Sequence, residues 1–285
     1  MEGIKRILGF KIKDFTVGRF VRAILRRIGN VLYVFTWNLP FGYSKLNKAR
    51  LATFSNLHQG KRCFIVCNGP SLNKMDLTLL KDEFTLGMNR IYLMEEVNGF
   101  KPTYLFCLDK AVQLLQFTEE FDAVDVPCFY NWDLNTIFSR KSNQHFFKGK
   151  FSPAFSKDPL VNMLGNGKTV TYIAIQFAYY MGFTEVYLIG KDHSYNTAVK
   201  PTNAVISDGH DQNHFSPKYY KPGQIWDAPD YFSEEFAYKL ARKAFEESGR
   251  KILDATLGGK LDVFEKVNFY ELFPTKDKAE VKVLS

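Results

Sequence analysis

The chain has 285 residues, 46% of them hydrophobic, and a formal net charge of +8. This length and composition suffice for one substantial core and exclude an intrinsically disordered chain. Residues 1–50 hold eleven Lys and Arg against two acidic residues, so the rest of the chain has 27 basic and 28 acidic side chains. The basic charge therefore belongs to the N-terminal segment, and the nearly neutral body gives no indication of nucleic-acid binding.

The N-terminal segment predicts a basic amphipathic helix. Apolar residues recur at helical spacing over residues 17–35, and four arginines lie largely off that stripe. Such a helix suits an anionic lipid surface, and the apolar stretch is shorter than the roughly 20 residues that span a bilayer. We therefore expect residues 4–41 to bind the inner face of a bacterial cytoplasmic membrane peripherally. The alternative is a helix that packs on the body with its arginines solvated.

Short apolar runs alternate with helical periodicity after a second expected helix at about residues 44–58. The helical pattern is clearest at residues 170–181 and 233–247. Nearly continuous apolar strands separated by helices indicate a parallel sheet that is covered on both faces. We predict an α/β fold with a variant Rossmann-like, doubly wound and mainly parallel sheet. The expected strands are 63–67, 85–88, 104–108, 127–130, 185–189 and 251–254.

The predicted organisation has three parts. Residues 1–58 form the basic helical arm, residues 59–275 the Rossmann-like catalytic domain, and residues 276–285 a C-terminal tail. Within the catalytic domain, residues 192–232 are polar and aromatic without clear periodicity. A connection of this length in a compact α/β domain is typical of a lid or a binding loop.

The four cysteines indicate a reducing compartment. They stand at positions 63, 67, 107 and 128, each in an apolar run, without a CxxC pair or a histidine at zinc spacing. We expect small core residues and no metal site built on them, which agrees with a cytoplasmic protein.

The tetrapeptide Asn68-Gly-Pro-Ser follows the first expected strand. Gly69 permits close backbone approach or a positive φ, and Pro70 fits the first turn of a helix. Ser71 or Asn68 would cap that helix and leave N–H groups directed at an anion. Neither the Walker loop nor GxGxxG is present, which argues against a P-loop NTPase and an ordinary dinucleotide oxidoreductase. We predict a phosphate site here, with an ordinary turn as the alternative.

Polar residues also follow two other strands and open one helix. Asn89 ends the second strand, where its amide can read a sugar or a base edge. Asp109 ends the third strand and alternatively caps the next helix. Thr169 and Thr171 follow a Gly-rich entry into a helix that suits a carboxylate or a phosphate, although either threonine is alternatively an N-cap.

Two histidines are candidate general bases. The strand at 185–189 delivers Asp192 and His193 to the same edge of the sheet, and His214 lies among tyrosines in the expected lid. A histidine suits this role because its pKa lies near working pH, although a lone histidine is more often structural. The sequence leaves the choice between His214 and His193 open.

The order of these segments resembles the bacterial sialyltransferases of glycosyltransferase family 42. It is equally similar to a group described as 6-hydroxymethylpterin diphosphokinase MptE-like. The resemblance is carried by Asn-Gly-Pro-Ser-Leu at 68–72, by Asn89, by MGFTEVYLIGKDHSY at 181–195 and by the later histidine, and it covers about residues 60–270. It implies a variant Rossmann-type domain that transfers a sugar from a CMP-activated donor with inversion.

The resemblance also implies roles for individual residues. His214 matches the base in the lid, although its spacing departs from the sialyltransferase pattern and leaves His193 as a substitute. Asp109 stands where the sialyltransferases have an asparagine, so recognition of the donor sugar differs there. Tyr195 lies near a tyrosine that steadies the leaving phosphate. The implied donor-binding residues are Asn68, Gly69, Pro70, Ser71, Asn89, Asp109, Thr169, Thr171, Asp192 and Tyr195.

The resemblance implies a glycosyltransferase that moves a sialic acid or a related ulosonic acid to a surface glycan or a lipid-linked acceptor. No cofactor is expected to be essential and no metal site is expected, with Mg²⁺ as a possible addition. One alternative is an MptE-like pyrophosphokinase that uses Mg-ATP, with Asp109 and Asp192 as metal ligands. Another is a non-catalytic, membrane-associated protein that binds a sugar nucleotide. The donor sugar, the acceptor and the oligomeric state, a homo-oligomer included, stay open.

Overall fold

The computed structural model describes residues 29, 31–109, 113–195 and 204–274. The chain divides into two compact units between Leu46 and Asn47. Residues 31–38 are helical, whereas the rest of the predicted amphipathic stripe and the predicted tail at 276–285 lie outside the described residues. None of the helices in the described ranges is long and apolar enough to cross a membrane.

The second unit is built on an eight-stranded sheet in which every neighbouring pair is parallel. Its strand order is β12-β11-β8-β1-β2-β3-β4-β5. All six predicted strands form, and β5 and β12 are additional. The strands are β1 Arg62–Val66, β2 Phe84–Met88, β3 Tyr104–Phe106, β4 Cys128–Asn131, β5 Gln144–Phe147, β8 Glu185–Ile189, β11 Lys251–Asp254 and β12 Glu265–Lys266.

The strand order reverses between β1 and β8. From β1 the chain adds β2 to β5 on one side, and β8, β11 and β12 on the other. The inner strands β1, β2 and β8 are buried along almost their whole length, because both faces of the sheet are covered. The Rossmann-like, doubly wound prediction is confirmed. In such open sheets, ligands bind beyond the carboxyl ends of the strands at the point of reversal.

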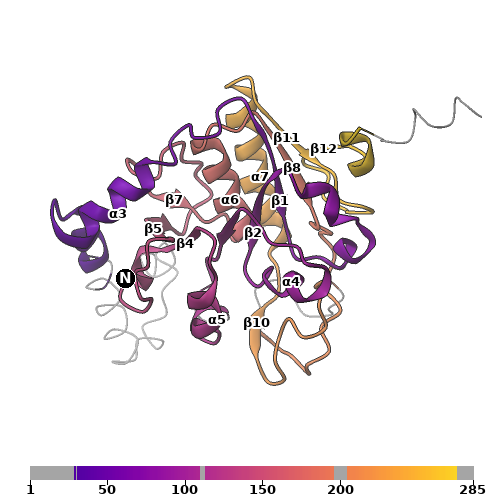
Figure 1. Ribbon diagram of the computed structural model, residues 1–285, viewed down its shortest axis with the longest axis horizontal. Helices are drawn as coiled ribbons and strands as arrows, with labels where there is room; N and C mark the ends of the chain where they lie inside the picture. The colour runs from indigo at the N-terminus through magenta and orange to yellow at the C-terminus, as the bar shows by residue number, and fades with distance from the viewer. Residues whose placement is uncertain (1–28, 30, 110–112, 196–203, 275–285) are drawn as a thin grey trace, which may run out of the picture. The chain divides into compact units, whose positions relative to one another are not determined.

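Two long helices, α6 and α7, lie side by side in this unit (Figure 1). Nine of the eleven residues of α6 are buried, which explains its almost wholly apolar sequence, whereas α7 buries one face. The α-helices are α3 Gly42–Ala52, α4 Leu93–Asn98, α5 Thr118–Ala123, α6 Val170–Tyr180 and α7 Tyr231–Glu246. The 3₁₀ turns are Pro70–Lys74, Leu77–Leu80, Trp132–Leu134 and Phe269–Leu272.

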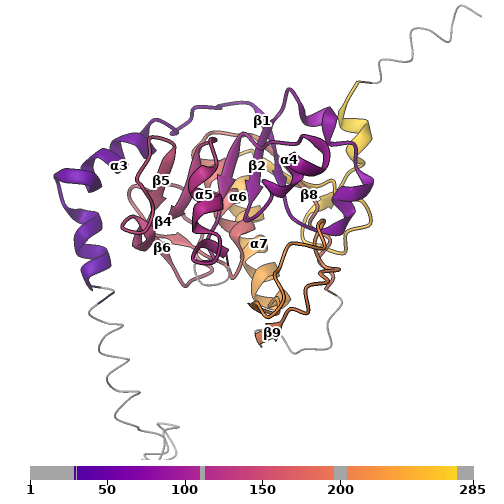
Figure 2. The same ribbon diagram turned by 60° about the horizontal axis from the view of Figure 1, so that its bottom comes forward.

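The expected lid contains regular structure that its sequence did not predict. Strands β9, Ala204–Ile206, and β10, Ile225–Asp227, form an antiparallel pair. Figure 2 shows this segment as the orange ribbon beyond the start of α7. Helix α7 begins at Tyr231 rather than at 233, because Asp230 accepts a hydrogen bond from the Ser233 N–H and caps it. A second short pair, β6 Gly149–Lys150 and β7 Leu164–Gly165, is parallel.

The four cysteines are buried and unbonded, which confirms that they are core residues. Burial raises the pKa of the Cys67 thiol to about 12. This cysteine is therefore neutral at physiological pH, although it lies at the end of β1. A neutral, buried thiol is not an activated nucleophile.

A buried histidine predicts a fold that is sensitive to acid. His145 on β5 is 5% exposed and packs against the rings of Phe54 and Phe129. Burial, together with the charge of Arg50, lowers its pKa from 6.5 to about 4. Between these two values the unfolded chain binds a proton that the folded chain excludes. As the pH is lowered from 6.5 to about 4, the free energy of unfolding should therefore decrease, by up to about 3 kcal/mol.

The variant His145→Phe isolates this effect, because its ring fits an aromatic cluster and does not titrate. Urea unfolding at pH 7.5, 6 and 5 should show a smaller loss of stability for the variant than for the parent chain. Equal pH dependence in the two proteins would mean that other groups cause the acid sensitivity.

Candidate active site

A cavity of about 410 Å³ opens at the carboxyl ends of β1, β2, β3 and β8. The start of α6 and the segment 213–230 complete its wall. The cavity therefore lies at the reversal of strand order between β1 and β8, where the fold class places ligands. Its volume falls in the range of pockets that bind small molecules.

Most of the residues predicted from the sequence line this cavity, although they are far apart along the chain. Pro70 and Ser71 do not line it. Those that do are Asn68, Gly69, Asn89, Asp109, Thr169, Thr171, Asp192, His193, Tyr195 and His214.

Hydrogen-bond donors of the Asn68–Ser71 turn are bonded to other groups of the protein. The Gly69 N–H donates to the Gly190 carbonyl over 2.9 Å. The Ser71 N–H donates to Oδ1 of Asp192 over 3.2 Å, and the Ser71 hydroxyl donates to Oδ2 over 2.7 Å. No side chain caps the 3₁₀ turn that follows. The prediction that Ser71 or Asn68 caps a helix is therefore wrong. Ser71 is instead bonded to the Asp192 carboxylate, which is itself an anion at this turn.

Close approach, rather than backbone conformation, explains the glycine in this turn. Gly69 has a φ of −70°, which any residue adopts. A Cβ atom there would lie 1.8 Å from Oδ2 of Asp192 and 2.6 Å from the Gly190 carbonyl oxygen. The turn thus joins the ends of β1 and β8 tightly. Whether it also binds a phosphate stays a prediction.

The same turn holds the backbone beside His214. The carbonyl of Asn68 accepts a hydrogen bond from the Phe215 N–H over 2.9 Å, and Nδ2 of Asn73 donates to the Phe215 carbonyl over 2.8 Å. These two bonds place His214 against the sheet from a segment that is distant in sequence.

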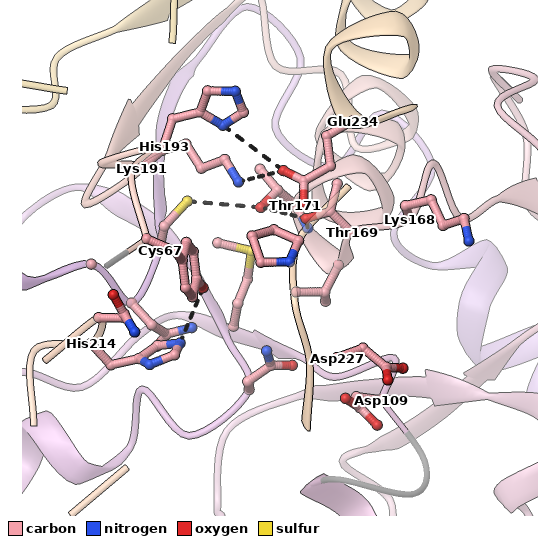
Figure 3. A pocket seen from close by; sticks show the side chains of 18 of the residues that line it. Cys67, Asp109, Lys168, Thr169, Thr171, Lys191, His193, His214, Asp227 and Glu234 are labelled. Atoms are coloured by element: carbon pink, nitrogen blue, oxygen red, sulfur yellow. Dashed lines mark hydrogen bonds and ion pairs between the residues drawn. The ribbon is translucent and has the colours of Figure 1, made fainter. Parts of the chain in front are cut away.

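His214 is the centre of a hydrogen-bonded chain in the cavity wall. Its side chain is 6% exposed, and Nδ1 lies 2.6 Å from Oδ2 of Asp211. Its Nε2 lies 3.3 Å from the Tyr195 hydroxyl (Figure 3). Because a carboxylate accepts only, Nδ1 carries the hydrogen and Nε2 presents a lone pair. Burial raises the pKa of Tyr195 well above its ordinary value, so Tyr195 stays a neutral hydroxyl that donates to Nε2.

His193 is placed differently. Its Nε2 lies 3.0 Å from Oε1 of Glu235, and its Nδ1 lies 4.0 Å from Oε2 of Glu234. Burial and the nearby Lys191 charge lower the pKa of His193. Among the described residues, Nδ1 of His193 has no hydrogen-bond partner, whereas both nitrogens of His214 are bonded, to Asp211 and to the Tyr195 hydroxyl. A lowered pKa weakens His193 as a base, so His214 is the first candidate.

A buried ion pair in the cavity wall was not predicted from the sequence. Nζ of Lys191 lies 2.7 Å from Oε2 of Glu234, and their side chains are 13% and 6% exposed. Burial alone would lower the pKa of Lys191, but the Glu234 carboxylate raises it well above its ordinary value. The wall thus holds a permanent ammonium group. The stretch Gly-Lys-Asp-His contains this lysine, whereas nothing in the helical pattern of α7 distinguishes Glu234.

Two amide side chains reach the cavity without a hydrogen-bond partner for their oxygens. These are Oδ1 of Asn68 and Oδ1 of Asn89, both buried among the described residues. Asn89 has a φ of 50°, a conformation that asparagine tolerates better than most residues. A buried acceptor without a donor costs about 1–3 kcal/mol. Hydroxyl or amino groups of a ligand would satisfy both oxygens.

The two threonines stand at the start of α6. The Thr169 hydroxyl accepts a hydrogen bond from the Thr171 N–H over 3.3 Å and caps the helix. The N-cap alternative is therefore confirmed for Thr169. The Thr171 hydroxyl lies 3.2 Å from the Thr169 hydroxyl and 3.8 Å from Sγ of Cys67. Because both threonines line the cavity, the positive end of the helix dipole faces it.

Five carboxylates line the cavity, those of Asp109, Asp192, Asp227, Asp230 and Glu234. Asp109 and Asp227 lie on the same side of it (Figure 3). Asp192, the second metal ligand in the pyrophosphokinase alternative, is instead bonded to Ser71. Within the described ranges, no group of three or more His, Cys, Asp or Glu side chains is placed to hold a metal ion.

The fold and the cavity define a Rossmann-like α/β protein with a ligand site at the reversal of strand order. Residues 35–198, more than half of the chain, match the family described as 6-hydroxymethylpterin diphosphokinase MptE-like. The chain belongs to this MptE-like family. The matched region contains the Asn68–Ser71 turn and the stretch that ends β8, and it stops before His214.

No relative was found among the curated proteins. Among solved structures, the chain is similar to the MAf glycosyltransferase from Magnetospirillum magneticum AMB-1, with 15% sequence identity and a TM-score of 0.48. The likeness covers 80% of this chain and 39% of that one, so the chain spans well under half of the length of that protein.

Proposed function

We propose that this protein is a glycosyltransferase that moves an acidic sugar, a sialic acid or a related ulosonic acid, from a CMP-activated donor to a glycan or lipid-linked acceptor. The observation that carries the proposal is the pair of Asp211 and His214. The carboxylate fixes Nδ1–H, and the lone pair of Nε2 accepts the hydrogen of the Tyr195 hydroxyl, which lines the cavity. This is the arrangement of an oriented general base.

The reaction would proceed by inversion at the anomeric carbon. The bond from that carbon to the phosphate oxygen of CMP breaks, and CMP leaves with the electron pair. The acceptor oxygen forms the new bond to the anomeric carbon, and its proton passes to the Tyr195 oxygen as the Tyr195 proton passes to Nε2 of His214. Asp211 then stabilises the imidazolium. A base in this position contributes about 10² to 10⁴ in rate.

The N-terminal end of α6 is a positive element of the cavity wall that would stabilise a carboxylate or a phosphate of the donor. The Lys191 ammonium lies in the same wall but is paired with Glu234. The unpaired oxygens of Asn68 and Asn89 provide acceptors for the hydroxyl and amino groups of a nucleoside. The resemblance to the sialyltransferases supports the same set of roles.

The acceptor and the location are proposed from the N-terminal arm. A lipid-linked or surface-glycan acceptor agrees with a basic arm at residues 4–41 that binds an anionic membrane from the cytoplasmic side. Most of that segment lies outside the described residues, so its support is the sequence pattern alone.

A second candidate function is pyrophosphoryl transfer from ATP. The description of the MptE-like family favours it, and so does the presence of Asp109 and Asp227 on one side of the cavity. Mg²⁺ bound to ATP commonly takes one or two carboxylates together with phosphate oxygens, and this pair would fit that role. The ion would neutralise phosphate charge, and His214 would accept a proton from the attacking hydroxyl.

Thermal unfolding in the presence of nucleotides separates the two functions. We expect CMP at about 100 times its dissociation constant to raise the melting temperature by a few degrees, because ligand binding then adds about 2.7 kcal/mol of stability. The shift should be the same with Mg²⁺ and with EDTA. CDP, UDP, GDP and ATP are the comparison ligands. Stabilisation by Mg-ATP without any response to CMP would contradict the proposal and favour the kinase.

A further inference from the structure

Arg90 connects the sheet to the segment that carries His214. It follows β2 directly after Asn89, and its side chain is 6% exposed. Its Nη1 donates to two successive carbonyl oxygens, that of Lys218 over 3.2 Å and that of Tyr219 over 2.6 Å. A buried guanidinium therefore holds the backbone of the expected lid.

The rest of the guanidinium is fixed from the opposite side. Its Nη2 lies 3.0 Å from Oε2 of Glu120, and its Nε donates to the Tyr92 hydroxyl over 3.1 Å. The Tyr92 hydroxyl in turn donates to Glu120 over 2.7 Å, and Cζ of Arg90 lies 3.7 Å from the centre of the Phe117 ring. Because the planar guanidinium has its donors in a rigid fork, these contacts set its position and orientation together.

Tyr219 connects Arg90 to the imidazole of His214. Its ring is parallel to the ring of His214, with an interplanar angle of 0° and centroids 3.9 Å apart. Phe215, the residue after His214, is held by Asn68 and Asn73. The segment that follows His214 is thus held at two points, at Phe215 by these bonds and at Lys218 and Tyr219 by Arg90.

We propose that Arg90 is a positioning residue for His214. By holding the carbonyls of 218 and 219, it places the Tyr219 ring so that the imidazole keeps Nδ1 on Asp211 and Nε2 toward the cavity. Arg90 does not itself line the cavity, so its effect passes through Tyr219. The proposal rests on the proposed function in that His214 is taken to be the base.

The test uses the nitrogen spectrum of the imidazole, which needs no substrate. The full chain is labelled with ¹⁵N-histidine, the His214 signals are assigned with His214→Gln, and spectra are recorded from pH 5 to 9. We expect a single Nδ1–H tautomer in the parent chain. In Arg90→Met and in Arg90→Lys we expect mixed tautomers or broadened signals and a changed titration midpoint. Lysine keeps the charge but has no fork to hold two carbonyls and Glu120 at once.

Arg62→Met is the matched control. Arg62 also pairs with a carboxylate, Glu83, and donates to a backbone carbonyl, that of Leu272, but it lies at the start of β1, away from the cavity. Its loss should lower the melting temperature without altering the His214 signals. If Arg90→Met also lowers the melting temperature without altering the His214 signals, Arg90 is a purely structural residue and the proposal is wrong.

A turnover measurement separates this proposal from the proposed function. If the chain releases CMP from a CMP-activated sugar, Arg90→Lys should lower kcat at least tenfold and change the KM for the donor less than twofold. Failure of the parent chain to turn over would count against the proposed function and leave the spectral test intact. If Arg90→Met does not fold, Glu120→Gln weakens the same network, and unchanged His214 signals in that folded variant would overturn the proposal.

Discussion

Replacing His214 with alanine should lower kcat for CMP release by about 10² to 10⁴ and leave CMP binding unchanged. The imidazole lies in the cavity wall with Nε2 directed inward, whereas the predicted nucleotide contacts come from other elements. Chromatographic detection of CMP gives the rate, and calorimetric titration with CMP gives the affinity. A variant that keeps more than a tenth of the parent kcat would remove His214 from the mechanism.

Asp211→Asn is the companion variant. An asparagine amide can donate to Nδ1 and so stabilise the wrong tautomer, in which Nε2 carries the hydrogen and cannot accept a proton. We expect a loss of kcat of the same order as for His214→Ala, with normal CMP affinity. His193→Gln is the comparison variant, because Nε2 of His193 is bonded to Glu235 of α7 and burial lowers its pKa. A larger loss for His193→Gln than for His214→Ala would reverse the assignment of the base.

Gly69→Ala should destabilise the protein by about 3 kcal/mol or more. The new Cβ would lie 1.8 Å from Oδ2 of Asp192 and 2.6 Å from the Gly190 carbonyl oxygen. The ends of β1 and β8 would have to separate, and the Asp192 bonds to Ser71 would weaken. Chemical denaturation, compared with the parent chain, measures the loss.

Gly29→Ala is the control for that substitution, because a Cβ at Gly29 meets no atom of the described residues within 4 Å. The double variant Gly69→Ala/Asp192→Ala should recover part of the lost stability, since it removes the nearer of the two obstructing groups. If Gly69→Ala matched Gly29→Ala within about 0.5 kcal/mol, the close join between β1 and β8 would be refuted.

The central strands could be predicted because their burial and their composition agree. β1, β2 and β8 are buried nearly throughout, and their apolar runs have no other interpretation at this length. β5 could not be predicted in this way, because it begins with Gln144 and His145. Both side chains are buried. Gln144 is hydrogen-bonded to Lys141 and Asp122, whereas His145 packs among aromatic rings and its Nδ1 has no hydrogen-bond partner among the described residues. β12 has two exposed residues and no pattern to recognise.

The candidate site was predictable where its residues end strands. Asn68, Asn89, Asp109 and Asp192 were found because the carboxyl ends of neighbouring parallel strands share one edge. The carboxylates that pair with His214 and Lys191 were not predicted, because such pairs depend on packing rather than on position in a pattern. Asp211 gave a local signal, three residues before His214, whereas Glu234 reaches Lys191 from a helix 43 positions later in the sequence.

The Asn68–Ser71 turn shows what sequence reasoning lacks most. Its composition indicated an anion site, and the anion in contact with Ser71 is a side chain of the protein itself, Asp192. Arg90 is a similar case. In the sequence, an arginine directly after a strand is not distinguished from an ordinary surface residue. The role of Arg90 follows only from its contacts with the carbonyls of Lys218 and Tyr219, which lie far along the chain.

Phosphorus NMR of the purified chain with two substrates is the most direct test of the central claim. One sample contains a CMP-activated sialic acid and EDTA, and the other contains ATP, Mg²⁺ and a hydroxymethylpterin. We predict conversion of the donor to free CMP in the first sample, abolished by His214→Ala, and no AMP in the second. Formation of AMP and a diphosphate ester, with the CMP-activated sugar left intact, would contradict the account.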